Sequence, residues 1–517
     1  MELNDSYETI IIGSGFGGAF AAYALARAGR EVLVVDRGVW VERDDSCWDE
    51  QRLHLDDPPL YQGRTPIEID QRDGRLERDW PYDTVGGMAT FYGCASFRMR
   101  EQDFAGSPLA GSTERERAWP LDYAELAPHY DEAERLLGVS GARGEDANEP
   151  PRGDFPQPPP AELPEHTRRV WRASEELGLN PFHLPLAINF DGQHGKNPCS
   201  QCHTCDHFLC KLEAKNEPSV SVLPLAMAAG ARVLADSRAV RIDTSGDRVT
   251  AVELVDQRSG ERKRVTTERL ILAAGGIGTP HLLLASGIAV EADGRNLIGR
   301  NLMRHCNGVL VGVFPFRTNR RKVLQKLIGI GGCYFGDPEG NGAEPVGPWG
   351  MLQEIAIVGK GTIKRHSPFG LKNLAATISP CTSGLICIAE DLPQPDNRVL
   401  LGDERDAFGM PSARIHHRYH PRDRAALAAL YRVARRVLRR AGAWMFRSQP
   451  IDTFSHVLGT CWMGEQRDRS VVDRDCRLWS LRNLYITDCS ALPSTGSVNP
   501  SLTIGANALR VARQLIA

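Results

Sequence analysis

The sequence predicts an α/β protein, α+β overall, built on a Rossmann-type dinucleotide-binding domain. Three observations predict this fold. The apolar run YETIII (7–12) leads into a glycine-rich turn and an alanine-rich helix; a second strand, glycine turn and helix follow at 264–288; and two more apolar strands, 231–242 and 249–256, precede that segment. Strands that alternate with helices in this way are typical of a largely parallel sheet covered by helices.

The turn after the first strand carries a dinucleotide fingerprint. Gly13, Gly15 and Gly18 form G-x-G-x-x-G between strand and helix, and the next strand, EVLVV (31–35), ends at Asp36. The first glycine permits the tight turn, the second lets the backbone approach a pyrophosphate at the helix N-terminus, and the third lets helix and strand pack closely. An acid at position 36 accepts from a ribose hydroxyl and disfavours a 2′-phosphate. We therefore expect an ADP-containing dinucleotide, NAD or FAD.

Composition and charge exclude several classes of protein. The 517 residues suffice for two domains, and a net charge of −3 gives no electrostatic case for binding nucleic acid. No apolar run is long enough to cross a membrane, and the N-terminus shows no secretory signal, so we expect cytoplasmic residence. Amphipathic helices are expected over 119–139 and 422–442, and the proline-rich, charged stretch 142–164 is expected to be an exposed connection.

The last sixty residues place polar groups around one strand. His456 lies in FSHVLGTCWMG (454–464), Asp488 in NLYITDCSALP (483–493), and Asn499 and Pro500 in GSVNPSLTIGANALRVARQ (496–514). An ordinary apolar core does not need a histidine, an aspartate and an Asn-Pro pair around a single strand. A cofactor site that includes the far end of the chain does.

Together these segments resemble the GMC (glucose–methanol–choline) oxidoreductases over nearly the whole chain. The resemblance rests on 13–38, 84–104, 273–288, 395–401 and the terminal block, whose order HxxGTxxMG, SVVD, NLYxxDxSxxP, NPSLT follows the family pattern. This ending looks closer to the pyranose-oxidase, sterol-oxidase, gluconate-dehydrogenase and bacterial FAD sugar (aminoglycoside) dehydrogenase branches than to the glucose-oxidase branch, which carries a second histidine.

The resemblance implies how the chain is divided and which cofactor it binds. A discontinuous FAD-binding domain would comprise 1–100, 225–305 and 455–517, and a substrate-binding domain with an antiparallel sheet would comprise 101–224 and 306–454. FAD would be bound noncovalently, because no histidine stands at 92–94, where some relatives attach the flavin. The residues implied to bind FAD are Gly13, Gly15, Phe16, Gly18, Asp36, Arg37, Gly86, Gly87, Val240, Ala274, Gly275, Asp488, Asn499 and Pro500.

The implied reaction is the oxidation of an alcohol to a carbonyl, with hydride transfer to flavin N5. Such a reaction needs a proton acceptor near the hydroxyl, and a neutral imidazole suits this role because its ordinary pKa is about 6.5. His456 takes the place of the family's catalytic histidine, and Asn499 that of its partner, whose amide donates to the alcohol oxygen without titrating. From residue type alone, His456 could also be a buried core histidine and Asn499 a helix N-cap.

A cysteine-rich loop is the least certain feature of the sequence. Cys199, Cys202, Cys205 and Cys210 follow the spacing C-x2-C-x2-C-x4-C, which resembles a local set of iron–sulfur ligands but departs from the ferredoxin pattern. The alternatives are a zinc site and, above all, structural thiols or a disulfide. An iron–sulfur cluster would favour a dehydrogenase that passes electrons to an external acceptor.

The substrate is expected to be a sugar, a glycoside or an aminosugar. Gln353 and Glu354, in the segment 347–356, are candidates to bind its hydroxyl or amino groups, and the loop 91–98 is a second lining segment. The alternatives are a lipophilic or sterol-type alcohol, or a role as the dehydrogenase subunit of an electron-transfer flavoprotein with an iron–sulfur cluster. The expected electron acceptor is oxygen, a quinone or another carrier.

Overall fold

A seven-stranded sheet forms the dinucleotide-binding half of the molecule. The computed structural model describes residues 3–71, 75–108, 115–116, 118–192, 197–335, 349–355, 359–367 and 370–517. The strands are, in spatial order, β8 (Arg232–Leu234), β2 (Val32–Val35), β1 (Ser6–Ile12), β11 (Arg262–Leu272), β10 (Arg248–Asp256) and β9 (Ser237–Ser245), with β21 (Leu484–Ile486) also on β11. The neighbouring strands β8, β2, β1 and β11 pair in parallel, and β21 also pairs in parallel with β11. Strand β10 is antiparallel to both of its neighbours, β11 and β9.

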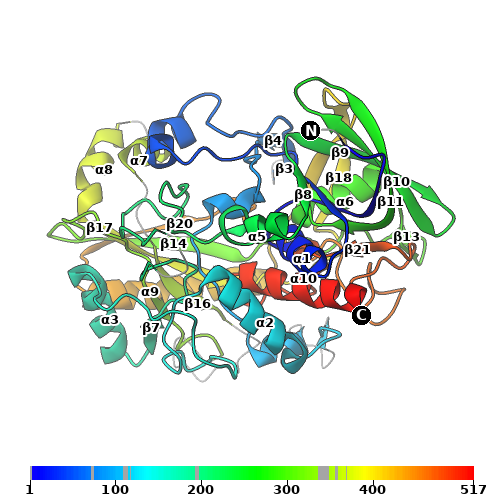
Figure 1. Ribbon diagram of the computed structural model, residues 1–517. Helices are drawn as coiled ribbons and strands as arrows, with labels where there is room; N and C mark the ends of the chain where they lie inside the picture. Colours follow the sequence, from blue (N-terminus) through cyan, green and yellow to red (C-terminus); the bar gives the residue numbers. More distant parts are fainter. Residues whose placement is uncertain are drawn as a thin grey trace.

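Helices from opposite ends of the chain pack together beside this sheet. Figure 1 shows α10 (Ser501–Ile516), red, beside α1 (Phe16–Arg27), blue. A Cβ added at Gly505 of α10 would lie 3.2 Å from the Phe20 ring of α1, so the small residue is what allows this close approach. The other helices of this half are α2 (Tyr123–Leu137), α4 (Pro218–Ser221), α5 (Leu223–Ala228) and α6 (Gly275–Ala285).

A six-stranded antiparallel sheet forms the other half. Helix α9 (Pro421–Arg440) packs on β14, β16 and β17, while α3 (Glu165–Glu176) packs on β7, β15 and α9. The apolar residues of α9 recur with helical spacing. Helix α9 therefore buries one face against the sheet and leaves most of its arginines exposed. The strands are, in spatial order, β20 (Met445–Pro450), β14 (Cys306–Val313), β17 (Thr382–Ala389), β16 (Met351–Ile355), β15 (Ile328–Ile330) and β7 (Pro181–His183).

The remaining elements are short. A four-stranded sheet packs against α6 and contains β18 (Arg398–Arg405), β19 (Pro411–His416), β3 (Ile67–Asp70) and β4 (Leu76–Asp79). Two hairpin-like pairs join β12 (Glu291–Ala292) to β13 (Arg295–Asn296) and β5 (Ser107–Pro108) to β6 (Arg115–Glu116). Short helical turns are α7 (Lys360–His366), α8 (Lys372–Ile378), η1 (Asp45–Trp48), η2 (Gln51–Leu55), η3 (Gly87–Phe91), η4 (Glu101–Ala105), η5 (Ser379–Cys381) and η6 (Cys489–Ala491).

The predicted fold class is confirmed, and one local expectation is wrong. The stretch 142–164 contains no helix or strand, but it is not simply an exposed connection, because Asp146 and Gln157 are buried within it. Strand pairing also crosses the predicted domain boundaries, since β3 from 1–100 pairs with β19 from 306–454. The division into two domains stays a prediction. Among the described residues, no helix combines the length and apolarity needed to cross a membrane.

Candidate functional site

The glycine turn after β1 is packed too tightly for larger residues. Gly13 has φ +100°, and a Cβ there would lie 2.3 Å from the Ala273 carbonyl oxygen. A Cβ on Gly18 would lie 1.9 Å from the Gly13 carbonyl oxygen. The fingerprint glycines at 13 and 18 are therefore required by the close approach of β1, α1 and the end of β11.

Three other predicted glycines face open space instead. A Cβ on Gly15 would meet nothing closer than 3.7 Å, one on Gly87 nothing closer than 3.8 Å, and one on Gly275 nothing within 4 Å. Gly15 is also the N-cap of α1, and no side chain caps this helix end. Helix amides without a cap and the positive end of the helix dipole favour an anion. The protein itself therefore leaves room for a larger group beside each of these three glycines.

Asp36 links the fingerprint turn to the loop that carries Gly86. Its carboxylate accepts from the Ser14 amide at 2.8 Å, the Ser14 hydroxyl at 2.5 Å and the Gly38 amide at 2.7 Å. The Ser14 hydroxyl in turn accepts from the Gly86 amide at 2.8 Å. Burial raises the pKa of Asp36, and these three hydrogen bonds oppose that rise. A carboxylate has about four acceptor sites, which leaves one for a ribose hydroxyl.

Ser14 was missed by the sequence reasoning, and only its place inside the fingerprint pointed to it.

Arg37 and Phe16, which were predicted to bind the cofactor, both contact other side chains of the protein. Arg37 pairs with Asp83 at 2.8 Å, and the Phe16 ring lies 5.5 Å from that of Tyr92. Neither contact tests a role in cofactor binding.

Asp488 joins the C-terminal block to helix α6. One carboxylate oxygen accepts from the Gly275 amide at 2.9 Å and the Thr279 hydroxyl at 2.5 Å, and the other accepts from the amide and hydroxyl of Ser490. Burial raises the pKa of Asp488, and these hydrogen bonds oppose the rise. A Cβ on Gly17 would lie 2.5 Å from the Thr487 carbonyl oxygen. The fingerprint helix, Ala274–Gly275 and Asp488 therefore meet at one place, although they are hundreds of residues apart.

Val240 lies at an irregularity of the edge strand β9. On β10, Glu253 and Leu254 are consecutive, but they pair with Arg241 and Ala239, so Val240 is the extra residue of a bulge. A bulge leaves backbone groups outside the ladder. The peptide groups of Val240 can therefore serve as hydrogen-bond partners for a base such as adenine.

His456 shares a hydrogen bond with a second histidine that the sequence reasoning did not single out. The Nδ1 atoms of His456 and His305 are 3.2 Å apart, and the rings meet edge to face with centroids 5.1 Å apart. His305 is 1% exposed, has φ +60° and directly precedes β14. Burial lowers the pKa of His456 to about 4, with a further contribution from the Lys326 charge. Burial likewise holds the pKa of His305 well below its ordinary value.

Asn499 is positioned by one of the two predicted substrate residues. The Gln353 amide donates to Asn499 Oδ1 at 2.7 Å, while Gln353 Oε1 is buried and has no partner among the described residues. The structure does not bring Glu354 to this place. Neighbouring residues of a strand point to opposite faces, and Glu354 accepts from the Thr167 hydroxyl of α3 at 2.7 Å. Burial raises the pKa of Glu354 to about 7.

The histidine pair and Asn499 are connected through the loop between them. Among the described residues no hydrogen bond joins His456 to Asn499, and Pro500 is the N-cap residue of α10. The backbone of Thr495 and Gly496 borders the His305 ring and favours its protonated form. The His456–His305 pair and the Gln353–Asn499 pair thus border the two ends of one short stretch of loop, 495–499.

The four cysteines of the cysteine-rich loop are held as separate side chains in the described structure. Within the described ranges, no three His, Cys, Asp or Glu side chains are grouped so that they could hold a metal ion, and Cys199, Cys202, Cys205 and Cys210 are all free thiols. Hydrogen bonds and an ion pair hold the loop instead. Lys215 donates to the Phe208 carbonyl at 2.6 Å and the Tyr92 carbonyl at 3.0 Å, and Lys326 pairs with Asp206 at 2.5 Å. Neither the iron–sulfur alternative nor a disulfide gains geometric support.

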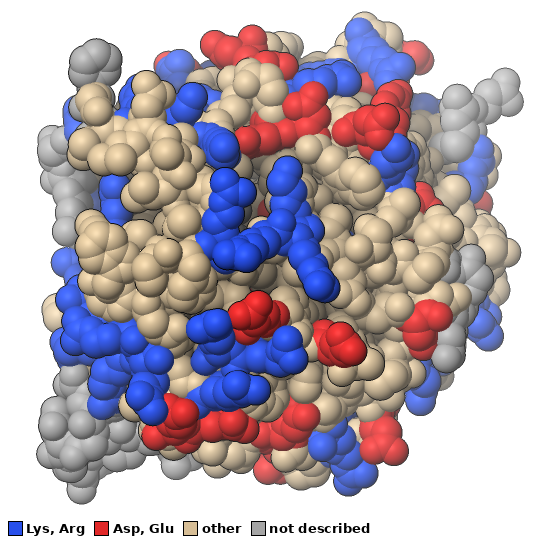
Figure 2. Space-filling model, turned by 90° about the vertical axis from the view of Figure 1, so that its left-hand side faces the viewer, with Lys and Arg blue, Asp and Glu red and all other residues tan. Residues whose placement is uncertain are grey.

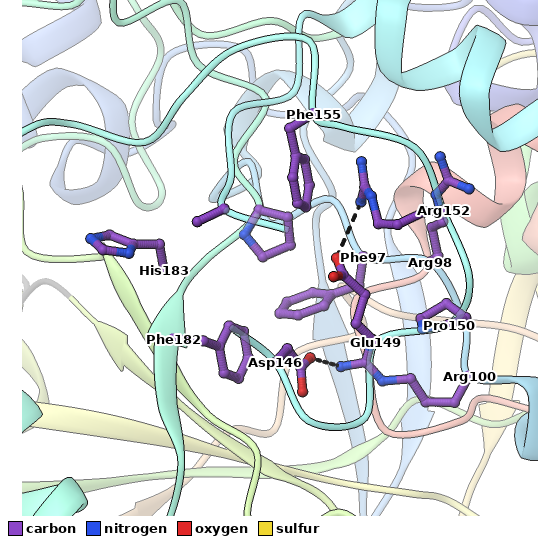
Figure 3. Close-up of a pocket in the computed structure, with 12 residues that line it drawn as sticks. Phe97, Arg98, Arg100, Asp146, Glu149, Pro150, Arg152, Phe155, Phe182 and His183 are labelled. Atoms are coloured by element: carbon purple, nitrogen blue, oxygen red, sulfur yellow. Dashed lines mark hydrogen bonds and ion pairs between the residues drawn. The ribbon is translucent and has the colours of Figure 1, made fainter. Parts of the chain in front are cut away.

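Two cavities lie away from the polar group around His456. The first has a volume of about 20 Å³ and is crossed by the Arg100–Asp146 pair and by Arg152 facing Glu149 (Figure 3). This space holds about one water molecule, not a substrate. The second, of about 600 Å³, lies at the carboxyl ends of β2 and β8. Neither cavity is lined by His456 or Asn499.

Comparison with known proteins assigns the family. GMC oxidoreductase models match residues 157–307 and 393–508, and a Rossmann-like NAD(P)-binding model matches 11–39. The chain is 33% identical to 6‴-hydroxyparomomycin C oxidase of Streptomyces lividus and 32% identical to paromamine 6′-oxidase of Streptomyces fradiae, over 98% of this chain and 91% of each relative.

Solved structures agree at the level of fold. Formate oxidase superposes with a TM-score of 0.71 at 15% identity over 99% of both chains. Pyridoxine 4-oxidase from Mesorbium loti superposes with a TM-score of 0.68 at 20% identity, over 98% of this chain and 99% of that chain. The sequence relatives, the matched models and the shared fold together show that this chain belongs to the GMC oxidoreductase family.

Proposed function

We propose that the protein is an FAD-dependent enzyme that oxidises a primary alcohol of an aminosugar to a carbonyl. The observation that carries the proposal is the His456–His305 pair beside the loop that leads to Asn499, because this arrangement supplies a neutral base and an amide donor together. The aminosugar assignment is supported by the two relatives that are named for oxidising paromomycin-type compounds.

The residues present fit FAD. The open space at Gly15, Gly87 and Gly275 is what a pyrophosphate and a flavin require, and the uncapped N-terminus of α1 faces the same turn. The buried hydroxyls of Thr487 and Ser497 have no partner among the described residues, so they remain available to a bound ligand. When FAD is bound, its flavin ring supplies the acceptor for the hydride.

The side chains of this chain have separate tasks in the proposed reaction. His456 accepts the hydroxyl proton, because its lowered pKa keeps the ring neutral at ordinary pH. Asn499 holds the alcohol oxygen with its amide N–H groups, because Gln353 donates to the Asn499 carbonyl oxygen and so fixes which end of the amide faces the alcohol. Holding the alcohol in one orientation contributes separately from the proton transfer.

His305 is the residue that selects the reactive tautomer of His456. Two neutral imidazoles that share one hydrogen bond must divide the roles of donor and acceptor. The backbone of Thr495 and Gly496 opposes the lowering of the His305 pKa by burial. We propose that the ring hydrogen faces this backbone from Nε2, so that Nδ1 accepts from His456 Nδ1–H. In that arrangement His456 Nε2 carries the lone pair that accepts the substrate proton.

Substitutions at His305 test this tautomer assignment. We expect His305→Leu to slow flavin reduction by about tenfold or more, because His456 is then free to carry its proton on Nε2. His305→Asn should restore most of the rate, since Asn Oδ1 replaces Nδ1 as an acceptor and asparagine tolerates φ +60°. Anaerobic stopped-flow reduction measures both. Equal rates for the leucine and asparagine variants would contradict the assignment.

The pH dependence follows from the direction of the His456 pKa. A base whose pKa is lowered to about 4 is protonated only in acid, so activity should extend below the range of an ordinary histidine. We expect the rate constant of flavin reduction to stay level from pH 8 to about pH 5 and to fall near pH 4. An inflection at about 6.5 or above would show that His456 is not the buried neutral base.

Anaerobic bleaching of the flavin tests the substrate class directly. We expect aminosugars and aminoglycosides with a free primary hydroxyl to bleach the enzyme, and simple aliphatic alcohols and sterols to leave it oxidised. Bleaching by sterols alone would overturn the aminosugar assignment. We propose oxygen as the acceptor, because both relatives are named oxidases. Recovery of the flavin spectrum with a quinone but not in air would identify a dehydrogenase instead.

A further inference from the structure

One face of the molecule is strongly basic, although the whole chain has a net charge of −3. Three segments, 313–322, 359–382 and 435–450, together contain thirteen lysines and arginines and no aspartate or glutamate. Figure 2 shows basic side chains gathered at the centre and left of this face, with acidic ones mainly towards its upper and lower edges. The neighbouring helix α3 contributes Glu176, which pairs with Arg440.

The three segments are joined in space at the end of β14. Met445 of β20 pairs with Val313, and the Trp444 amide donates to the Val313 carbonyl at 3.0 Å. On the other side, the Phe314 amide donates to the Cys381 carbonyl at 2.8 Å, and the Thr318 amide donates to the Pro380 carbonyl at 3.0 Å. Pro380 and Cys381 lie in η5, which directly follows α8. These contacts place the ends of the three segments side by side. Helix α7 extends the surface by packing on α8, and its Gly361 and Thr362 amides donate to the acidic Glu50.

Large apolar side chains protrude from the same surface. Leu371 is 53% exposed, Leu374 58%, Trp444 66% and Met445 50%. Among the described residues only twelve large apolar side chains are exposed, and these four are among the most exposed of them. A group of this kind, surrounded by cations, is typical of an interaction site rather than of a solvated surface. We call these four residues and the described parts of the three segments (313–322, 359–367, 370–382 and 435–450) the basic–apolar face.

We propose that the basic–apolar face docks on an anionic lipid bilayer. Lysines and arginines are attracted to the negative surface of such a bilayer, while a tryptophan and leucines enter the boundary between headgroups and acyl chains. Leu374 lies on the short helix α8, Leu371 directly precedes it, and Trp444 lies in the turn between α9 and β20, so each can enter a lipid interface without a matching pocket on a partner.

Where it is built on the end of β14, beside 380–382 and 444–445, the basic–apolar face lies far from His305, so FAD content and flavin reduction can be measured separately from docking. His305 directly precedes the first residue of β14, whereas Val313 is its last. Eight strand residues at about 3.3 Å each separate the two by roughly 25 Å. Substitutions on the face are therefore expected to leave FAD content and flavin reduction unchanged.

Vesicle sedimentation of the holoenzyme tests the proposal. We expect the protein to sediment with vesicles of equal parts phosphatidylglycerol and phosphatidylcholine, to stay in solution with phosphatidylcholine alone, and to be released by salt. Each cation near an anionic surface strengthens binding roughly fivefold, so R320E/R321E/K322E should weaken partitioning by about a hundredfold or more. L374S/W444S should weaken it at constant charge.

A matched control separates the face from the overall charge. R248E/R295E/R467E makes the same change in net charge at exposed positions outside the three segments, and it should bind vesicles far better than R320E/R321E/K322E. Equal binding of both triple variants, or equal binding of the holoenzyme to both kinds of vesicle, would overturn the proposal. Capture by immobilised polyglutamate without sedimentation on either vesicle would also overturn it and indicate an acidic protein partner. FAD absorbance and melting temperature check that each variant is folded.

Discussion

Replacing His456 with alanine is expected to leave FAD bound and to slow flavin reduction by substrate by about 10²- to 10⁴-fold. This is the usual contribution of a positioned general base. No residue proposed to hold the pyrophosphate depends on this side chain, which forms a hydrogen bond with His305. FAD absorbance measures the bound cofactor, and anaerobic stopped-flow reduction measures the chemical step.

The control for this experiment is an exposed histidine of the four-stranded sheet. His416→Ala removes an imidazole on β19 that lies near Asp70 at 3.4 Å, so its reduction rate should match that of the unmodified enzyme. If His456→Ala reduced its flavin as fast as His416→Ala does, another group would have to accept the proton. If His456→Ala lost its FAD, the residue would be structural.

Two glycines of the same fingerprint are expected to respond in opposite ways to a larger side chain. Gly15→Val should fold normally but lose FAD, because its Cβ has only ordinary contacts with protein and the backbone is extended at φ −65°. The added methyl groups would enter the space proposed for the pyrophosphate. Gly18→Ala should destabilise the protein itself, because its Cβ would lie 1.9 Å from the Gly13 carbonyl oxygen.

Thermal unfolding and flavin absorbance distinguish the two outcomes. We expect Gly18→Ala to lower the free energy of unfolding by about 1–3 kcal/mol or more, as overpacking does. We expect apo Gly15→Val to melt near the temperature of the FAD-free unmodified protein, which is the fair reference because bound cofactor itself raises stability. A Gly15→Val protein that is purified with a full complement of FAD would show that the open space beside Gly15 is not the pyrophosphate site.

Much of the fold could be predicted because the signals were local. The run from 7 to 12 became β1 (Ser6–Ile12), the segment 31–35 became β2 (Val32–Val35), and the second expected amphipathic helix became α9 (Pro421–Arg440). Apolar periodicity, glycine stops and proline entries act within a few residues, so they can be read without tertiary information. The prediction for 142–164 was wrong because its proline-rich, charged composition gives no sign that Asp146 and Gln157 are buried. Asp146 pairs with Arg100, and Gln157 donates to the Gly138 carbonyl, both outside the stretch.

The candidate site was predictable only where a residue belongs to a motif. Gly13, Gly18, Asp488 and His456 were singled out in this way, and the structure gives each of them close contacts with other parts of the chain. His305 and Ser14 carry no comparable signal, because their importance comes from a partner far away in the sequence. Glu354 shows the converse: it is next to Gln353 in the sequence but points to the opposite face of β16.

By itself, the sequence determined that this protein has a dinucleotide-binding α/β fold, because backbone sterics and apolar periodicity are local properties. The alcohol-oxidising type of the C-terminal block was implied by its resemblance to the GMC oxidoreductases. Only the tertiary structure decided which side chains meet. It paired His456 with His305 and turned Glu354 away from Asn499. Such contacts depend on how distant strands register and how loops cross them, and no pattern within a short stretch of chain encodes that.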